Sequence, residues 1–434
     1  NMDTTVSAGT DFFRYACGGW NDAHPLTAEY SRYGTFDELF ENSQKQLREL
    51  IEGLAAQKNN QAGSAAQKIG DLYNMAMDSV TLNKQGAEPV KAMLDKIAGM
   101  KDKSEIVPMM TEMAHIGIGT YFRSYVYADP KNSSLNIFQM GQGGINLGEK
   151  EYYLDTDSIT QNIREQYKLY IGKLFQLAGF SEADAQQKVA DVMEVETAIA
   201  KVSRSATELR DPEANYHKMS FDELKKTISG IDWDAYMKGL GIQVPAELNV
   251  EQVEPIQEVA RLMNTLPLSK HVSYLEYNLL DAAASCLSDD FVAARFDFYG
   301  KVLSGRQVNQ PRWKRAVNSV NGMLGELVGE MYVEKYFPAA AKERMVKLVK
   351  NLQTALGERI DAQEWMSDST KIRAHEKLAT FHVKVGYPDK WKDYSKLEIK
   401  NDSYWANVCR ASEWGFNDMY SRIGKPVDKD EWLM

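Results

Sequence analysis

The stretch AHEKLATFH (374–382) contains the residues whose types could form a zinc site, two histidines and a glutamate. A zinc peptidase helix carries its histidines four residues apart, so that both imidazoles reach one metal ion from adjacent turns. His375 and His382 are seven residues apart. That spacing is roughly 10 Å along a helix, too far for two ligands at about 2 Å. The stretch therefore predicts an ordinary surface helix and no metal ligand.

No other local motif in the sequence indicates a reaction. The remaining histidines have no histidine partner four residues away: His24, His115, His217 and His271. Neither the GxSxG turn of serine hydrolases nor the GxxxxGK[ST] phosphate-binding loop occurs. The cysteines form no CxxC pair, and their odd number argues against a self-contained disulfide framework: Cys17, Cys286 and Cys409. The residues alone identify no catalytic group.

Composition excludes several classes of protein. The formal net charge is −10, and basic residues alternate with acidic ones, as in REQYKLYIGK (164–173), so nucleic acid is not an expected partner. Apolar runs are far shorter than the roughly 20 residues that span a bilayer. The first residues, NMDTTVSAGTDFF, lack a signal peptide pattern, so the protein is either cytoplasmic or already processed. A length of 434 residues predicts two domains, or one large lobe with parts of another.

Helices must position most side chains of this protein. Apolar residues spaced three and four apart predict a helix over 36–54, with Thr35 and Glu38 as its capping box. Ser220 and Glu223 form a second such box. Glycines such as Gly179 and Gly300 mark helix ends. Similar patterns predict helices over 158–178, 181–203, 220–229, 267–286, 288–304, 311–331, 339–364 and 367–384.

One region has a β pattern. Residues 119–142 are rich in aromatic and β-branched types around the turn DPKNSS. This composition predicts strands over Tyr121–Ala128 and Leu135–Met140, joined as a hairpin. From Gly386 onward the sequence predicts a loop-rich tail. The expected fold class is mainly α, with a large helical lobe and a small β-hairpin region.

Six stretches of the sequence, in order, resemble the neprilysin and endothelin-converting-enzyme family of zinc metallopeptidases. The resemblance extends over essentially the whole chain and is to the N-terminal portion of that family. The stretches are DFFRYACGGW (11–20), SRYGTFDEL (31–39), ELRDPEANYHKMS (208–220), PRWKRAVNSVNGMLGELVGEMYVEKYF (311–337), MSDSTKIRAHEKLATFHVKVGYPDKW (366–391) and GKPVDKDEW (424–432).

The resemblance implies a division of the chain. In the family, a mainly helical lobe caps a thermolysin-like catalytic domain over a large chamber that admits peptides. Residues 41–384 would form the capping lobe, with the hairpin and a linking segment at about 119–150. Residues 1–40 and 385–434 would belong with the catalytic domain. The HExxH helix and the further zinc-binding glutamate would follow Met434, so zinc is expected in the full-length protein only, and this chain alone should be inactive.

Two residues carry over from the family as substrate-binding candidates. Arg32 matches an arginine that engages the peptide's terminal carboxylate or backbone, and Asp37 matches the acid that orients it. A guanidinium suits a carboxylate because it donates two parallel hydrogen bonds. A second family arginine falls at Phe40 here. The alternative interpretation is a structural Arg32–Asp37 ion pair beside a helix start.

The cysteines bear on location. Cys17 matches a cysteine that, in the animal enzymes, forms a disulfide with a cysteine near the C-terminus. Ala316 stands where the family has another cysteine. Such sparse bridging resembles an exported bacterial member of the family, which implies the periplasm or cell surface with the signal peptide removed.

Three functions are consistent with the sequence. The first is the N-terminal portion of a zinc endopeptidase or oligopeptidase, with peptides as substrates and a C-terminal catalytic half as partner. The second is an exported helical protein that binds peptides or glycans without catalysis, since its 8 tryptophans and 22 tyrosines could stack on ligands. The third is a lobe that docks a separately encoded catalytic chain, for which an exposed apolar face is expected.

Overall fold

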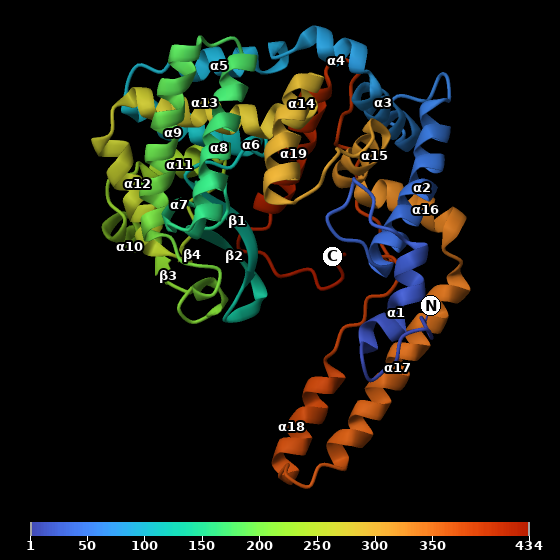
Figure 1. Ribbon diagram of the computed structural model, residues 1–434. Helices are drawn as coiled ribbons and strands as arrows, with labels where there is room; N and C mark the ends of the chain where they lie inside the picture. Colours follow the sequence, from blue (N-terminus) through green and yellow to red (C-terminus); the bar gives the residue numbers. More distant parts are fainter. Residues whose placement is uncertain (1, 433–434) are drawn as a thin grey trace.

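The protein, seen in a computed structural model that describes residues 2–432, is built mainly from helices (Figure 1). The α-helices are α1 (Phe12–Ala23), α2 (Thr35–Ala55), α3 (Ala65–Met77), α4 (Ser79–Gln85), α5 (Glu88–Ala98), α6 (Ile106–His115), α7 (Glu151–Leu154), α8 (Ser158–Leu177), α9 (Glu182–Val202), α10 (Phe221–Thr227), α11 (Trp233–Gly239), α12 (Val253–Thr265), α13 (Leu268–Ala283), α14 (Asp289–Arg295), α15 (Arg312–Met323), α16 (Gly325–Tyr336), α17 (Ala339–Asp361), α18 (Asp368–Ala379) and α19 (Tyr404–Tyr420). A π-helix, η4 (Phe296–Leu303), continues α14. The predicted mainly α fold class is confirmed.

A small sheet of four strands lies beside the helices. Its order is β1 (Phe122–Asp129), β2 (Asn132–Gln142), β4 (Glu247–Val250) and β3 (Lys218–Ser220). Strands β1 and β2 form the predicted antiparallel hairpin. Strand β4 pairs parallel to β2, and β3 pairs antiparallel to β4. The last two strands were not predicted, because three or four residues are too few to show an alternating pattern.

The buried core of the main helical part of the protein, called the body below, surrounds α13. Every residue from Ser273 to Leu280 is buried, so this helix contacts other elements on all its sides, among them α5, α8 and α9. Its one buried acid in that stretch, Glu276, is paired with Lys188 of α9 at 2.5 Å. Burial of a charge is tolerated here because a partner is present.

Helices α2, α3, α15 and α16 pack together on the side of the body that carries the N-terminus (Figure 1). Helices α17 and α18 form a hairpin that projects downward from this side, away from the body (Figure 1). The only α17 residue that is fully buried is Ile360, and α18 has none. The projecting hairpin is therefore poorly covered by the rest of the described chain.

The tail after Gly386 is rich in loops, as predicted, but within the described residues it also contains one long helix, α19, that was not predicted. Trp405, Phe416 and Tyr420 of this helix belong to the buried core. Further on, residues 424–427 run beside β2, where the Asn136 N–H donates to the Lys425 carbonyl at 2.9 Å. These contacts join much of 385–434 to the helical body. The assignment of residues 1–40 and 385–434 to a separate catalytic domain stays a prediction.

Several helix boundaries differ from those predicted. The Ser220–Glu223 capping box is confirmed, but the predicted box of Thr35 and Glu38 is wrong: Gly34, which has no side chain to accept a hydrogen bond, precedes α2, and only the Asp37 carboxylate accepts from the Gly34 N–H. Gly179 follows α8 with a φ of 96°, as a terminating glycine does, whereas Gly300 lies inside η4 and ends nothing. The predicted helix 311–331 is divided at Leu324 into α15 and α16. No helix within residues 2–432 is long and apolar enough to cross a membrane.

Candidate functional site

Arg32 lies on the segment between α1 and α2, and its side chain is exposed. Within residues 2–432 the Arg32 side chain forms no hydrogen bond and no ion pair. Asp37 instead accepts a hydrogen bond from the Gly34 N–H at 2.8 Å and so caps α2. The alternative of an Arg32–Asp37 ion pair is therefore wrong for the described chain. A role of either residue in substrate binding stays a prediction.

A buried lysine holds the segment that carries Arg32. Lys314 of α15 is 8% exposed, and its Nζ lies 2.9 Å from a Glu29 carboxylate oxygen and 2.5 Å from one of Glu41 in α2. The Tyr30 hydroxyl also donates to Glu41. Burial would raise the pKa of Glu41, but the hydrogen bonds from Lys314 and Tyr30 lower it below its ordinary value. These charges fix residues 29–30 against two helices.

The loop after η4 lies directly against the same segment. The N–H groups of Gln307 and Val308 both donate to the Ala28 carbonyl, at 2.9 and 3.1 Å. A Cβ placed on Gly305 would lie 3.6 Å from the Ser31 Cβ, one residue before Arg32. The Arg32 segment and the loop 304–310 thus form one continuous piece of surface.

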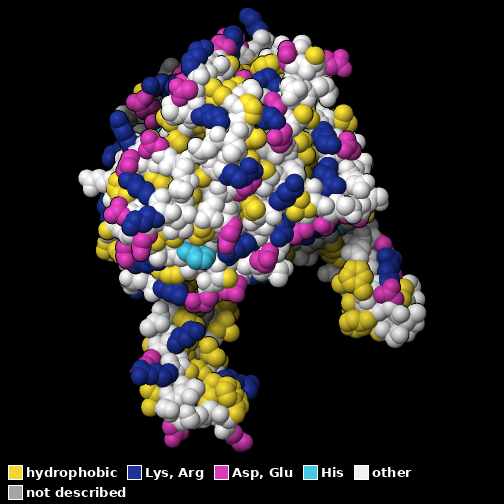
Figure 2. Space-filling view, turned by 90° about the vertical axis from the view of Figure 1, so that its left-hand side faces the viewer, with side chains coloured by type: hydrophobic (Ala, Val, Ile, Leu, Met, Phe, Trp, Pro, Cys, Tyr) yellow, Lys and Arg dark blue, Asp and Glu magenta, His cyan; other side chains and the backbone are white. Residues whose placement is uncertain are grey.

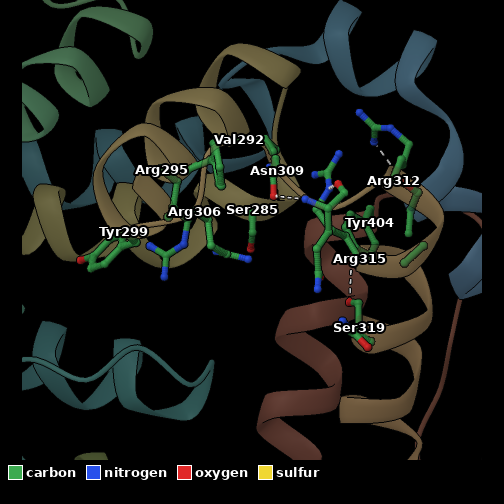
Figure 3. A pocket seen from close by; sticks show the side chains of 16 residues that line it. Ser285, Val292, Arg295, Tyr299, Arg306, Asn309, Arg312, Arg315, Ser319 and Tyr404 are labelled. Carbon is green, nitrogen blue, oxygen red and sulfur yellow. Dashed lines mark hydrogen bonds between the residues drawn. The ribbon is translucent and has the colours of Figure 1, made fainter. Parts of the chain in front are cut away.

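Behind this loop lies a pocket with a volume of about 460 Å³. Arg295, Tyr299 and Arg306 line one side of it, and side chains of α15 and α19 line the opposite side (Figure 3). A pocket of this volume is within the range that binds small molecules or a short piece of a larger ligand. Its full lining is Ala76, Ser285, Val292, Arg295, Phe296, Tyr299, Gly300, Arg306, Asn309, Gln310, Arg312, Arg315, Ala316, Asn318, Ser319 and Tyr404. We refer to it below as the arginine pocket.

The arginine pocket is positively charged. Four arginines and no carboxylate line it. Arg295 is paired with Asp281 at 2.7 Å, and Arg312 is paired with Asp289. Arg306 and Arg315 form no ion pair within the described chain. Burial lowers the pKa of the Arg315 guanidinium, and the nearby charge of Arg312 lowers it further. The pocket thus contains two guanidinium groups that form no ion pair within the described chain, although the more distant Asp289 carboxylate acts on Arg315.

The histidines of 374–382 lie elsewhere, on and after α18. This helix ends at Ala379, so His382 is outside it. His375 is 2.7 Å from Asp361, and His382 is 3.3 Å from Asp430, with all four side chains exposed. Within residues 2–432 no group of three or more histidine, cysteine, aspartate or glutamate side chains is placed to hold a metal ion. All three cysteines are free: Cys17, Cys286 and Cys409.

Sequence reasoning named Arg32 as a candidate and did not name Arg306 or Arg315. The lining of the arginine pocket comes from residues 76, 285–319 and 404. No local motif connects positions so far apart. The one available signal was the density of arginines between 295 and 315.

Comparison with known proteins gives consistent matches along the chain. The sequence profile described as "Peptidase family M13" matches residues 8–388. Endothelin-converting enzyme 1 of Rattus norvegicus and of Homo sapiens are each 28% identical to the whole of this chain, which covers 59% and 58% of them. The chain therefore spans about three fifths of the length of these relatives.

Solved structures match equally well. The zinc metalloprotease ZMP1 of Mycobacterium tuberculosis, in complex with an inhibitor, superposes with a TM-score of 0.92 at 31% identity, over 100% of this chain and 65% of that chain. PEPO from Lactobacillus rhamnosis superposes with a TM-score of 0.88 at 19% identity, over 99% and 68%. The latter likeness concerns the fold alone.

Proposed function

Because the chain belongs to peptidase family M13, we propose that it is the N-terminal, mainly helical part of a zinc endopeptidase or oligopeptidase that cleaves peptides within a closed chamber. The described residues do not form a zinc site, so we place the zinc and the reacting groups in the remainder of the full-length protein. There the metal would polarise the scissile carbonyl. The part of this chain would be to cover the chamber and to bind the peptide, with Arg32 as a binding residue.

The observation that carries this proposal is an apolar stripe on α17. Met345, Leu348, Leu352 and Leu356 are spaced three and four residues apart, so they lie on one face of the helix. Their side chains are between 44% and 62% exposed. Apolar side chains are also exposed on the same projection (Figure 2), among them Trp365 and Ile372.

A contiguous exposed apolar face of this kind marks a surface that another part of a protein or a partner covers. At the N-terminal end of the chain, Phe12, Phe13 and Phe36 are also 66% to 85% exposed. We propose that the catalytic half of the same protein covers both surfaces. The exported location inferred from the cysteines is part of this proposal, and cell fractionation of the natural host with an antibody to the chain tests it.

The direct test compares the product of the complete reading frame with the 434-residue chain. The complete product is expected to hold one zinc ion per chain and to hydrolyse peptides, and the shorter chain to do neither. Zinc content is measured by atomic absorption after dialysis, and hydrolysis with a quenched fluorescent peptide. A complete product that binds peptides or glycans but contains no zinc and cleaves nothing would instead support the binding protein.

The Leu352→Lys variant tests the covered stripe. In the 434-residue chain it is expected to reduce self-association and the binding of a hydrophobic dye, because it removes exposed apolar surface. In the complete product it is expected to lower the free energy of unfolding by about 2 to 4 kcal/mol, because a charge then enters a buried contact. Thr354→Lys, on the opposite side of the same helix, is the matched control and should change neither. If Leu352→Lys changed the free energy of unfolding equally in the two proteins, that result would contradict a covered stripe.

A further inference from the structure

The charge of the arginine pocket is the unexplained feature of this molecule. Arg315 is half-buried, and within residues 2–432 its only side-chain hydrogen bond is from Nε to the Gln310 carbonyl at 3.2 Å. Arg306 is also half-buried, with its guanidinium carbon 5.4 Å from the centre of the Phe296 ring. Removing a guanidinium from water costs free energy that a carboxylate normally compensates. Neither arginine has a carboxylate in contact with it within the described chain.

The backbone adds to the positive potential. Helix α15 begins at Arg312 beside the pocket, and no side chain caps its first N–H groups. The N-terminus of a helix carries a partial positive charge and free donors, which favour an anion. Two guanidinium groups without an ion pair in the described chain therefore line this space, and the uncapped start of α15 lies beside it.

We propose that the arginine pocket binds a carboxylate group of a peptide through Arg306 and Arg315. The guanidinium fork matches a carboxylate by two parallel hydrogen bonds, which a neutral amide cannot accept equally well. The identity of the ligand as a peptide rests on the proposed function. The binding of a carboxylate at this position rests on the geometry of the pocket.

Continuity with the Arg32 segment supports a peptide ligand. The loop that carries Arg306 is hydrogen-bonded to Ala28, and Gly305 lies beside Ser31, so a chain bound near Arg32 would reach the pocket along one surface. The carboxylate could belong to the C-terminus of the peptide or to an aspartate or glutamate side chain. Both sources offer the same chemistry, and matched peptides separate them.

Peptide binding is measured on the complete product after a chelator has removed its zinc. The pocket is then tested by binding alone and not by peptide cleavage. The first two probes are the N-terminally labelled peptide Ala-Ala-Phe-Ala-Ala with a free C-terminal carboxylate and the same peptide with a C-terminal amide. Two further amidated probes replace the last alanine with glutamate or with glutamine. We expect about tenfold or stronger binding of a carboxylate probe than of its neutral partner, measured by fluorescence anisotropy. Preference for the free C-terminus or for glutamate identifies the source, and no preference overturns the proposal.

Variants assign the effect to the pocket. Arg306→Gln and Arg315→Gln are each expected to reduce the preference for carboxylate about tenfold, and Arg315→Lys to restore only part of it, because lysine keeps the charge but not the fork. Arg210→Gln, which removes an equal charge from an exposed site outside the pocket, should leave the preference unchanged. Thermal unfolding confirms that each variant is folded. A preference that survives both glutamine variants would overturn the assignment to this pocket.

The outcomes separate this inference from the proposed function. If the complete product with zinc cleaves peptides but does not distinguish carboxylate from amide, the inference is wrong and the proposed function stands. If the protein cleaves nothing yet binds the carboxylate probes through Arg306 and Arg315, the inference stands and the proposed function is wrong.

Discussion

The Glu196→Ala variant is expected to have a free energy of unfolding about 3 to 5 kcal/mol lower than the unchanged chain. Glu196 of α9 is fully buried, and its carboxylate accepts hydrogen bonds from Asn146 Nδ2 at 2.7 Å and from the Tyr153 and Tyr167 hydroxyls at 2.7 and 2.9 Å. Alanine would leave three buried donors without an acceptor and a cavity beside them. Urea unfolding followed by circular dichroism measures the change.

A matched control is available on the same helix. Glu194 lies two residues earlier, is about half exposed and pairs with Lys270 on the surface. Glu194→Ala should cost less than about 1 kcal/mol, because exposed ion pairs contribute little. A cost for Glu196→Ala as small as that of the control would mean that the three donors find other partners, and the buried network would then have no role in stability.

Glu196 also makes stability depend on pH. Burial raises the pKa of Glu196 to about 7 in the folded chain, although the hydrogen bonds from Tyr153 and Asn146 oppose the shift. The unfolded value is 4.5, so the folded state binds the proton more tightly. The stabilisation is complete below pH 4.5 and is lost as the pH rises to about 7, by about 3 kcal/mol. Glu196→Gln, which cannot ionise, should lack this decline between pH 5 and 7.5, and parallel stability curves for the two proteins would contradict the assignment.

The helices and the hairpin could be predicted because their signals are local. The residues of α2, α8 and α9 repeat their apolar positions every three or four residues, and the turn between β1 and β2 is marked by Asp129, Pro130 and Asn132. Each signal depends on neighbours in the sequence only. Such elements form from their local sequence in any fold that can bury their apolar face.

Other elements depend on partners far along the chain. Strand β4 pairs with the edge of β2, whose residues lie more than 100 positions earlier, and β3 in turn pairs with β4. The burial of Glu196 was equally invisible, because its charge predicts a solvated position and only Tyr153 and Tyr167 make the buried position tolerable. The arginine pocket has the same origin, since η4, α15 and α19 meet only in the folded chain.

Lys314→Met is the second substitution with a large expected effect, a loss of about 2 to 4 kcal/mol in the free energy of unfolding. Lys314 neutralises Glu29 and Glu41, whose side chains are 27% and 15% exposed. Methionine fills the same space but leaves both carboxylates with no cation at this contact. Urea unfolding measures the loss. Lys301→Met, at an exposed lysine paired with Asp297, is the control and should cost less than about 1 kcal/mol.

A second substitution separates lost charge compensation from lost packing. In Lys314→Met with Glu41→Gln the less exposed carboxylate is also removed, so the double variant should recover at least about 1 kcal/mol of the loss. A double variant that is less stable than Lys314→Met would show that packing of the lysine stem, and not the unpaired charge, causes the effect.

The same lysine should govern peptide binding without contacting the peptide. Lys314 fixes Glu29 and, through Glu41, Tyr30, and Arg32 follows two residues later on that segment. If Arg32 binds the peptide, Lys314→Met should weaken binding of the carboxylate probe to the complete product, because Arg32 is then less well positioned. In the Arg32→Gln background, Lys314→Met should weaken binding much less, because the arginine that Lys314 positions is then absent. Equal losses in the two backgrounds would mean that the segment contacts the peptide through other groups.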